Sequence, residues 1–298
     1  MLELFFRQSG ATLCTLSGGE PLLRQDLYEI VDFIASRGWA MNLVTNGTLL
    51  DARALDRLGE RRISIFELPL LSAEREIHDR MSGASGAFDQ VTDAIAELKL
   101  RGEMVVGVFV ATRVNLPTWR ETLELGVALG LDGVMFNRFN PGGQGAAHIE
   151  ELLASPHELQ AALDVAEQAS ELYDLPISCS IAMPPCLIDT TRYRRLTFGF
   201  CAAGTDRAYY TLDAVGNLRP CNHSPTVLGS ILERSFDELT RSPTMQRFIA
   251  ARPAFCSGCS IELQCLGGCK AAAEICCGSA SQMDPFLAAF HHQARKLD

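Results

Sequence analysis

The chain has 298 residues, of which 47% are hydrophobic and 21% are charged, and its 26 basic and 36 acidic side chains give a formal net charge of −10. This length and composition predict a folded protein with a substantial core and exclude a disordered chain. The acidic balance argues against a nucleic-acid-binding surface, which needs a stripe of basic side chains.

The first half of the chain alternates between strand and helix patterns. Short apolar runs predict strands at 12–16, 40–44, 63–68, 104–111 and 133–136. Apolar residues at helical spacing predict helices at 23–34, 52–58, 88–100 and 118–129. The valine-rich run at 104–111 lacks alternation, which predicts a strand buried on both faces. Strands that alternate with helices in this way indicate βαβ units and a parallel sheet.

Functional groups in parallel α/β folds gather where the strands end. The candidates at the predicted strand ends are Gly18-Gly19-Glu20, Thr45-Asn46-Gly47, Arg113 and Asn137-Arg138. After residue 141 the pattern changes to a polar stretch, a long helix at 156–173 and a segment that carries Cys179. We place the domain boundary between about 180 and 200 and assign residues 1–190 to the first domain and 191–298 to the second.

The 11 cysteines are distributed unevenly, because only Cys14 lies before residue 179 and eight lie between Cys201 and Cys277. The N-terminal residues have no basic leader of a signal peptide, and no apolar run approaches the ~18 residues of a membrane span. We therefore expect a cytoplasmic protein that contacts neither membrane nor nucleic acid. Thiols in that compartment favour metal over disulfides.

The cysteine spacing indicates the kind of metal site. It reads Cys201-x14-Gly216-x4-Cys221, then Cys256-x2-Cys259-x5-Cys265-x3-Cys269, then Cys276 and Cys277. Four thiols within fourteen residues, with glycines among them, let the backbone wrap a small inorganic cluster. One structural zinc uses only four thiolates, whereas two four-thiolate sites account for eight. The spacing therefore favours iron–sulfur clusters over zinc.

The same spacing resembles the seven-cysteine signature of the SPASM domain, the auxiliary-cluster module of radical S-adenosylmethionine (SAM) enzymes that modify peptides and proteins. LDAVGNLRPC and CLGGCKAAAE also resemble segments of that module. The resemblance implies two auxiliary [4Fe–4S] clusters, a ribosomal peptide or protein substrate, and a reductant such as flavodoxin or ferredoxin.

The resemblance also implies an interleaved ligand set. The first cluster would use Cys201, Cys221, Cys269 and an upstream residue, for which Cys186 is the candidate and Cys179 the alternative. The second would use Cys256, Cys259, Cys265 and a distal cysteine, Cys276 or Cys277, with Cys276 favoured. Interleaved ligands would couple metal loading to the folding of this half.

The first half resembles the radical SAM barrel. SGGEPLL resembles its GGEP motif, and LVTNGTLL, EIHDRMSG, VFVATRVN and MFNRFNPGG resemble later strand ends and loops in the same order. Glu20 would complement the ammonium of SAM, and Arg113 would pair with its carboxylate. The residues that the resemblance assigns to SAM are Gly18, Gly19, Glu20, Pro21, Thr45, Asn46, Arg113, Asn137 and Arg138.

Two features depart from the family. The Cys-x3-Cys-x2-Cys loop that holds the SAM-reducing cluster does not occur in the 298 residues, and Cys14 stands alone in a strand pattern as a core cysteine. We therefore expect an α/β fold with a partial (β/α)6 TIM-like barrel lacking its first β/α unit, followed by a small Cys-rich α+β SPASM domain. In the fourth family strand, Pro69 and Leu71 replace a Ser and an Asp, with Glu67 as the candidate substitute.

The sequence thus predicts a radical SAM/SPASM maturase, an oxidoreductase in which a 5′-deoxyadenosyl radical abstracts hydrogen from a peptide. We expect this chain alone to be inactive, and we favour an in-frame cluster motif upstream of Met1. The alternatives are a non-catalytic iron–sulfur protein that binds peptide or transfers electrons, and a zinc-stabilised binding module. Asp213 is a candidate base, although turn chemistry alone explains an Asp there.

Overall fold

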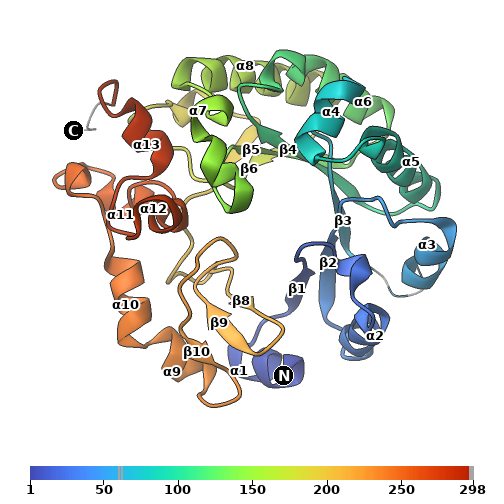
Figure 1. The fold of residues 1–298 in the computed structure, drawn as a ribbon, viewed down its shortest axis with the longest axis horizontal. Coiled ribbons are helices and arrows are strands. Elements are labelled where there is room, and N and C mark those ends of the chain that lie inside the picture. Colours follow the sequence, from blue (N-terminus) through green and yellow to red (C-terminus); the bar gives the residue numbers. More distant parts are fainter. Residues whose placement is uncertain (60, 62, 295–298) are drawn as a thin grey trace.

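The structure, a computed structural model, describes residues 1–59, 61 and 63–294. Its larger part is a parallel sheet of seven strands in the order β1-β2-β3-β4-β5-β6-β7, which curves as an inner layer with helices on its outer side (Figure 1). The strands are β1 (Leu13–Leu16), β2 (Ala40–Val44), β3 (Ile65–Pro69), β4 (Val105–Ala111), β5 (Gly133–Arg138), β6 (Ile177–Cys179) and β7 (Leu196–Phe198). The predicted partial barrel with a parallel sheet is therefore confirmed.

The helices of this part alternate with the strands. They are α1 (Leu2–Ser9), α2 (Leu27–Ser36), α3 (Ala52–Gly59), α4 (Arg75–Ser82), α5 (Ala87–Leu100), α6 (Trp119–Ala128), α7 (Ile149–Leu152) and α8 (Pro156–Tyr173). Short 3₁₀ turns are η1 (Pro21–Leu23), η2 (Leu116–Thr118), η3 (Gly143–His148) and η4 (Thr190–Arg192). Strand β2 and helix α8 have the predicted bounds, and α8 begins with a capping box in which Ser155 and Glu158 bond each other's backbone amides.

Strand β4 differs from its prediction. Its residues alternate between buried and half-buried along the whole strand, so only one face is fully covered. The covered face packs against the outer helices, whereas the other face lines the inside of the curved sheet, where no helix layer lies on it (Figure 1). The expectation of burial on both faces was wrong because valine occupies both faces of a strand in an open barrel.

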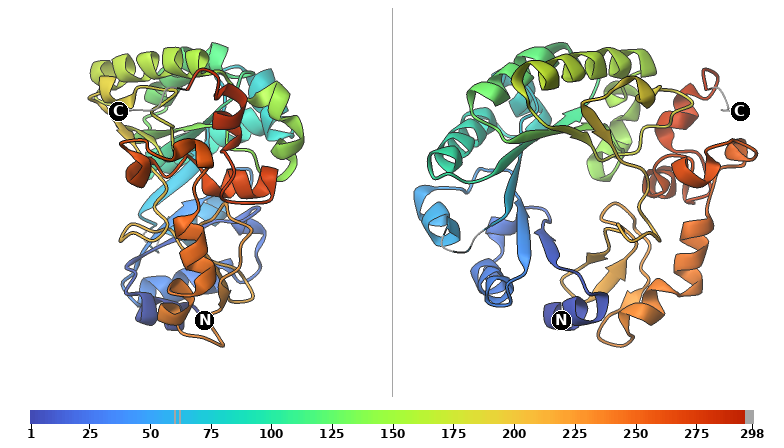
Figure 2. Two further views of the ribbon diagram at one scale, coloured as in Figure 1. Left: turned by 90° about the vertical axis from the view of Figure 1, so that its left-hand side faces the viewer. Right: turned by 180° about the vertical axis from the view of Figure 1, so that it is seen from behind.

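The remaining part is a cysteine-rich region with little regular structure. A small antiparallel sheet has the order β10-β9-β8, with β8 (Thr211–Leu212), β9 (Asn217–Arg219) and β10 (Gly229–Ser230). Short helices follow it: α9 (Phe236–Thr240), α10 (Pro243–Ala250), η5 (Ala254–Cys256), α11 (Glu262–Cys265), α12 (Lys270–Cys277) and α13 (Pro285–Phe290). This region spans the opening between the two ends of the parallel sheet and completes a ring (Figures 1 and 2).

Two contacts join the ring. Helix α1 stacks Phe6 on Trp39 of the barrel, with ring centroids 3.8 Å apart, and sets Phe5 against Phe236 of α9 at 5.6 Å. On the other side, α13 contributes Phe286 to the main core. None of the described helices has both the length and the apolar composition that crossing a bilayer requires.

Candidate cluster sites and SAM-binding edge

The carboxylate of Glu20 ties the ends of the first two strands together. One of its oxygens accepts hydrogen bonds from the Thr45 hydroxyl at 2.8 Å and the Leu22 amide at 3.1 Å, and the other accepts from the Asn46 amide at 2.8 Å. The preceding turn, residues 18–19, is exposed, and a Cβ built on either glycine meets no atom within 4 Å. Pro21 starts η1 and is buried. The edge therefore combines a fixed carboxylate with open space beside the backbone.

Two further predicted residues lie on the same edge. Arg113 follows β4 and is half exposed. Its backbone amide donates to the Leu152 carbonyl at 3.0 Å, and its guanidinium lies 3.4 Å from the Glu150 carbonyl and 4.0 Å from Glu158. Asn137, on the inner face of β5, accepts hydrogen bonds from the amide and hydroxyl of Ser180 at 3.0 and 2.8 Å. Arg113 is thus available to an acidic ligand, whereas the amide oxygen of Asn137 is already engaged within the chain.

Arg138 lies in a buried ion pair. Its side chain is 1% exposed, its Nε donates to the Ala182 carbonyl at 2.7 Å, and its Nη2 donates to Asp284, which is 0% exposed. Asp284 also accepts from the Cys269 amide at 2.6 Å and caps α13 through the Phe286 amide at 2.8 Å. Among the described residues, nothing accepts a hydrogen bond from the buried Nη1 of Arg138. The structure therefore places an incompletely satisfied cation beside Cys269, where an anionic group would complete it.

Three thiols gather on this side: Cys201, Cys221 and Cys269, hereafter the three-cysteine group. Burial raises the pKa of the Cys221 thiol to about 11, and the neighbouring thiols of Cys269 and Cys201 add to the rise. Asn140, two residues after Arg138, donates from its amide nitrogen to the Cys269 sulfur at 3.4 Å. A barrel side chain thus contacts a predicted cluster ligand of the other region.

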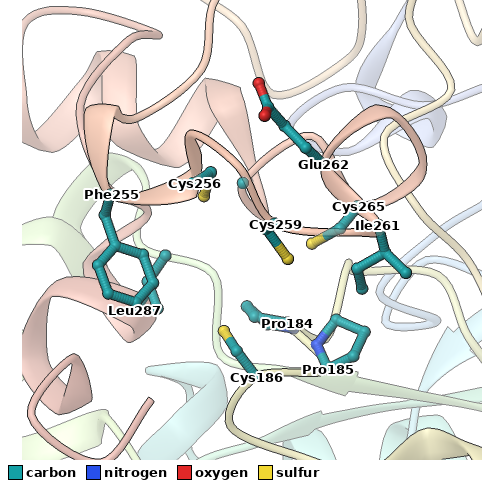
Figure 3. A pocket seen from close by; sticks show the side chains of 11 residues that line it. Pro184, Pro185, Cys186, Phe255, Cys256, Cys259, Ile261, Glu262, Cys265 and Leu287 are labelled. Carbon is teal, nitrogen blue, oxygen red and sulfur yellow. The ribbon is translucent and has the colours of Figure 1, made fainter. Parts of the chain in front are cut away.

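A second set of thiols lines a hollow that is partly open to solvent. Cys186, Cys256, Cys259 and Cys265 define it, and we call it the four-cysteine hollow; Figure 3 shows their sulfur atoms around one space. Burial raises the pKa of the Cys186 thiol to about 12, and the thiols of Cys265, Cys256 and Cys259 raise it further.

The backbone around the four-cysteine hollow suits a cluster. Gly267 has φ +81°, and a Cβ there would lie 2.4 Å from Pro253 Cδ and 3.5 Å from the Cys256 sulfur, so a side chain has no room. The Cys265 thiol has its pKa raised by burial, while hydrogen bonds from the backbone amides of residues 267 and 268 to the sulfur lower it. Amide hydrogen bonds to sulfur and apolar walls are features by which proteins tune iron–sulfur clusters.

The donor set fits the cluster implied by the resemblance. Four thiols meet the Cys₄ requirement of a [4Fe–4S] cluster. In the part of the chain that the structure describes, no three Cys, His, Asp or Glu side chains converge closely enough to hold one metal ion. The thiols surround a space, which is the arrangement that a polynuclear cluster needs.

The candidate fourth ligands of the two clusters do not lie where the resemblance implies. Cys186, expected with the first cluster, lies among the thiols expected for the second. Cys276 lies near Cys277, Asp284 and Cys269, and neither it nor the exposed Cys277 lines the hollow. The physical reason is the path of the chain after β6, which carries Cys186 out of the barrel and against α11.

The other two cysteines belong to the barrel. Cys179 on β6 is 1% exposed and part of the main core, so it joins neither set of thiols. Cys14 on β1 packs against the same core, and burial raises the pKa of its thiol to about 11. Both are in the position of core cysteines.

Asp213 makes the hydrogen bonds of a tight turn. Its carboxylate accepts from the amides of Val215 and Asn217 at 3.1 and 2.9 Å and from the Asn217 side chain at 3.0 Å. Two residues that the sequence did not single out lie beside the three-cysteine group: Asn140, described above, and Lys270, which is near Cys201. Lys270 is 3% exposed and donates to the Phe248 and Ile249 carbonyls at 3.0 and 2.6 Å. Its position directly after Cys269 is its only sequence signal.

The family comparisons agree with the two-part architecture. Residues 2–126 match the radical SAM superfamily, and residues 201–260 match SPASM, an iron–sulfur cluster-binding domain. The chain therefore matches the radical SAM superfamily in its first part and the SPASM domain in its second. These families bind [4Fe–4S] clusters and SAM.

Two curated proteins are similar to this one over nearly the whole chain. An AdoMet-dependent heme synthase of Methanosarcina barkeri (strain Fusaro / DSM 804) is 26% identical, over 93% of this chain and 82% of its own length. A PqqA peptide cyclase of Granulibacter bethesdensis is 25% identical, over 93% and 74%.

Solved structures share the fold. The Streptococcus suis SuiB structure bound to S-adenosylmethionine has a TM-score of 0.74 at 14% identity, covering 94% of this chain and 67% of that one. The native anSMEcpe structure with bound AdoMet has a TM-score of 0.69 at 17% identity, covering 98% and 85%. At these identities the likeness concerns the fold alone.

Proposed function

We propose that this protein acts in the radical SAM modification of a ribosomally made peptide or protein, binding SAM at the strand ends and two auxiliary [4Fe–4S] clusters in the SPASM domain. The observation that carries the proposal is the gathering of six spaced cysteines and Cys186 into two sets of thiols beside an open parallel sheet. A PqqA peptide cyclase among the relatives supports a peptide substrate.

The SAM-binding part of the proposal uses the described edge. The open backbone at residues 18–19 and the Glu20 carboxylate would receive the ammonium of SAM, and Arg113 would receive its carboxylate. Thr45 and Asn46 hold Glu20 in place through its hydrogen bonds. Asn137 accepts the hydrogen bonds of Ser180 on the inner face of the sheet.

The cluster part assigns the thiols as ligands. In the family, reductive cleavage of SAM supplies a 5′-deoxyadenosyl radical that abstracts hydrogen, and auxiliary clusters accept an electron or bind substrate. In this chain, Cys201, Cys221 and Cys269 would hold one cluster, and Arg138 and Asn140 would set the charge and polarity beside it. A reductant such as flavodoxin or ferredoxin would supply the electrons.

The experiment is metal and sulfide analysis of the whole chain purified anaerobically. We expect about eight irons with a matching amount of sulfide. Zinc without sulfide would contradict the proposal and favour a zinc-stabilised binding module. Incubation with SAM and dithionite should yield no 5′-deoxyadenosine from this chain alone, because its 298 residues contain no Cys-x3-Cys-x2-Cys. Formation of that product would contradict this expectation.

A tetrapyrrole is the second candidate substrate, because an AdoMet-dependent heme synthase matches the chain at similar identity and coverage. Equilibrium binding to the cluster-loaded protein separates the two. We expect saturable binding of a precursor peptide and none of an iron tetrapyrrole with carboxylate side chains. The reverse result would transfer the proposal to the second substrate class.

A further inference from the structure

We infer that Cys186, which comes from the barrel, is the fourth protein ligand of the [4Fe–4S] cluster held by Cys256, Cys259 and Cys265. The inference rests on the proposed function, because it requires that the four-cysteine hollow takes an iron–sulfur cluster. It replaces the assignment implied by the resemblance, in which a cysteine distal to Cys269 completes this set.

The segment that carries Cys186 is built to hold it in place. Pro184 and Pro185 restrict the backbone before it, and the amides of Leu187 and Ile188 both donate to the Pro184 carbonyl, at 2.9 and 3.1 Å. Ile188 is 0% exposed and anchors the turn in the main core. A thiol on such a turn has few conformations to lose when it binds metal.

The direction of the side chain agrees with this role. Figure 3 shows the Cys186 sulfur on the opposite side of the space from Cys256, Cys259 and Cys265, with Pro184 and Pro185 beside it. All four thiols line the same hollow. Three ligands from one short loop and a fourth from across the space enclose a cluster on both sides.

Neither Cys276 nor Cys277 lines the four-cysteine hollow, so neither takes the position of the fourth ligand. Cys276 and Cys277 lie at the end of α12, and Cys277 is exposed. Helix α13, which follows these cysteines in the chain, lines the hollow with the side chain of Leu287, which is 0% exposed. The part of the chain after Cys277 thus contributes an apolar side chain to the hollow, and leucine cannot bind iron.

One consequence concerns the architecture. Four thiolates satisfy every iron of a [4Fe–4S] cluster, so this site keeps no open position for substrate. Because Cys186 precedes residue 201, where the SPASM match begins, and the other three ligands lie in the cysteine-rich region, the cluster would link the barrel covalently to that region through metal–sulfur bonds.

The test isolates each site before Cys186 is changed. In the whole chain, Cys201→Ser with Cys221→Ser leaves only the four-cysteine hollow, and Cys256→Ser with Cys259→Ser leaves only the three-cysteine group. Each background should retain about four irons and four sulfides after anaerobic reconstitution. Iron, sulfide and the electron paramagnetic resonance spectrum of the reduced protein are measured.

Adding Cys186→Ser should remove the remaining [4Fe–4S] signal from the first background and leave iron, sulfide and spectrum unchanged in the second. The unchanged second background also shows that the substitution does not unfold the protein. Cys277→Ser is the matched control and should leave the first background unchanged. Loss of the cluster from the second background with retention in the first would overturn the inference. Absence of iron and sulfide from the unsubstituted chain would instead refute the proposed function.

Discussion

The parallel sheet and the cysteine-rich region differ in how much apolar side-chain surface each buries. The sheet has a continuous core that runs from α2 to α13 and includes the packed rings of Phe109, Trp119 and Phe136. The cysteine-rich region has a small cluster of its own: Ala203, Leu218, Leu228, Ile231, Leu239, Met245 and Phe248. A core that small rarely stabilises a fold without metal or disulfides. We therefore expect the sheet to fold by burial of its core and the cysteine-rich region to depend on its bound clusters for folding.

Removal of metal should produce the largest difference in stability between the sheet and the cysteine-rich region. When iron is chelated from the loaded protein, we expect amides between Cys201 and Cys277 to lose protection from hydrogen exchange while β1 to β7 keep theirs. Structural metal sites in small domains contribute on the order of 10 kcal/mol to folding. Hydrogen-exchange mass spectrometry checks this. Equal protection in both regions after chelation would show that the cysteine-rich region folds by itself.

Breaking the buried ion pair should have the next largest effect. Arg138→Ala leaves Asp284 buried without its cation, which should lower the free energy of unfolding by about 3–5 kcal/mol. Urea unfolding measures the loss. Arg120→Ala, an exposed arginine on α6, is the control and should change stability by less than about 0.5 kcal/mol. A similar small change for Arg138→Ala would mean that the two regions are not coupled through this pair.

A substitution at the proposed SAM-binding edge tests the function of the barrel without changing the cysteine-rich region. Glu20→Ala removes a carboxylate that accepts three hydrogen bonds, so we expect SAM to bind about tenfold more weakly, the equivalent of one charge-assisted hydrogen bond. Isothermal titration calorimetry measures the dissociation constant. Glu29→Ala on α2 is the matched control. If both variants bind SAM equally well, Glu20 supports only the local backbone.

The smallest effects are expected from two capping boxes of the same design, one in each region, which allow a direct comparison of how the regions unfold. Ser155 caps α8 in the barrel, and Ser235 caps α9 in the cysteine-rich region. Ser155→Ala should lower the barrel's free energy of unfolding by about 1 kcal/mol. Ser235→Ala should leave that value unchanged and increase exchange only in α9. Equal global losses would indicate that the two regions unfold as one cooperative unit.

Local patterns predicted most of the sheet because each strand and helix carries its own periodicity. Helix α8 was predicted to the residue, since a Ser-Pro-x-Glu start and a long apolar stripe define it. Helix α1 was missed because its eight residues look like an apolar patch, and its partner Phe236 is remote in sequence. Strand β7 has only three residues and carries no period of its own.

The candidate site was predictable only where spacing is local. The loop from Cys256 to Cys265 is visible in the sequence, because its three thiols lie within ten residues. The position of Cys186 depends on how the chain leaves β6, and the Arg138–Asp284 pair joins residues 146 apart. Such juxtapositions come from tertiary packing, and neither composition nor periodicity encodes them.

The contact between α1 and α9 also has a consequence for biosynthesis. The Phe236 amide donates to the Gln8 side chain at 2.7 Å across 228 residues of sequence. The ribosome completes α1 long before it makes α9, so the Phe5 ring has no native partner on α9 while the barrel strands assemble. Contacts of such long range slow folding and leave apolar surface uncovered. The native contact between α1 and α9 can therefore form only after most of the chain has been synthesised.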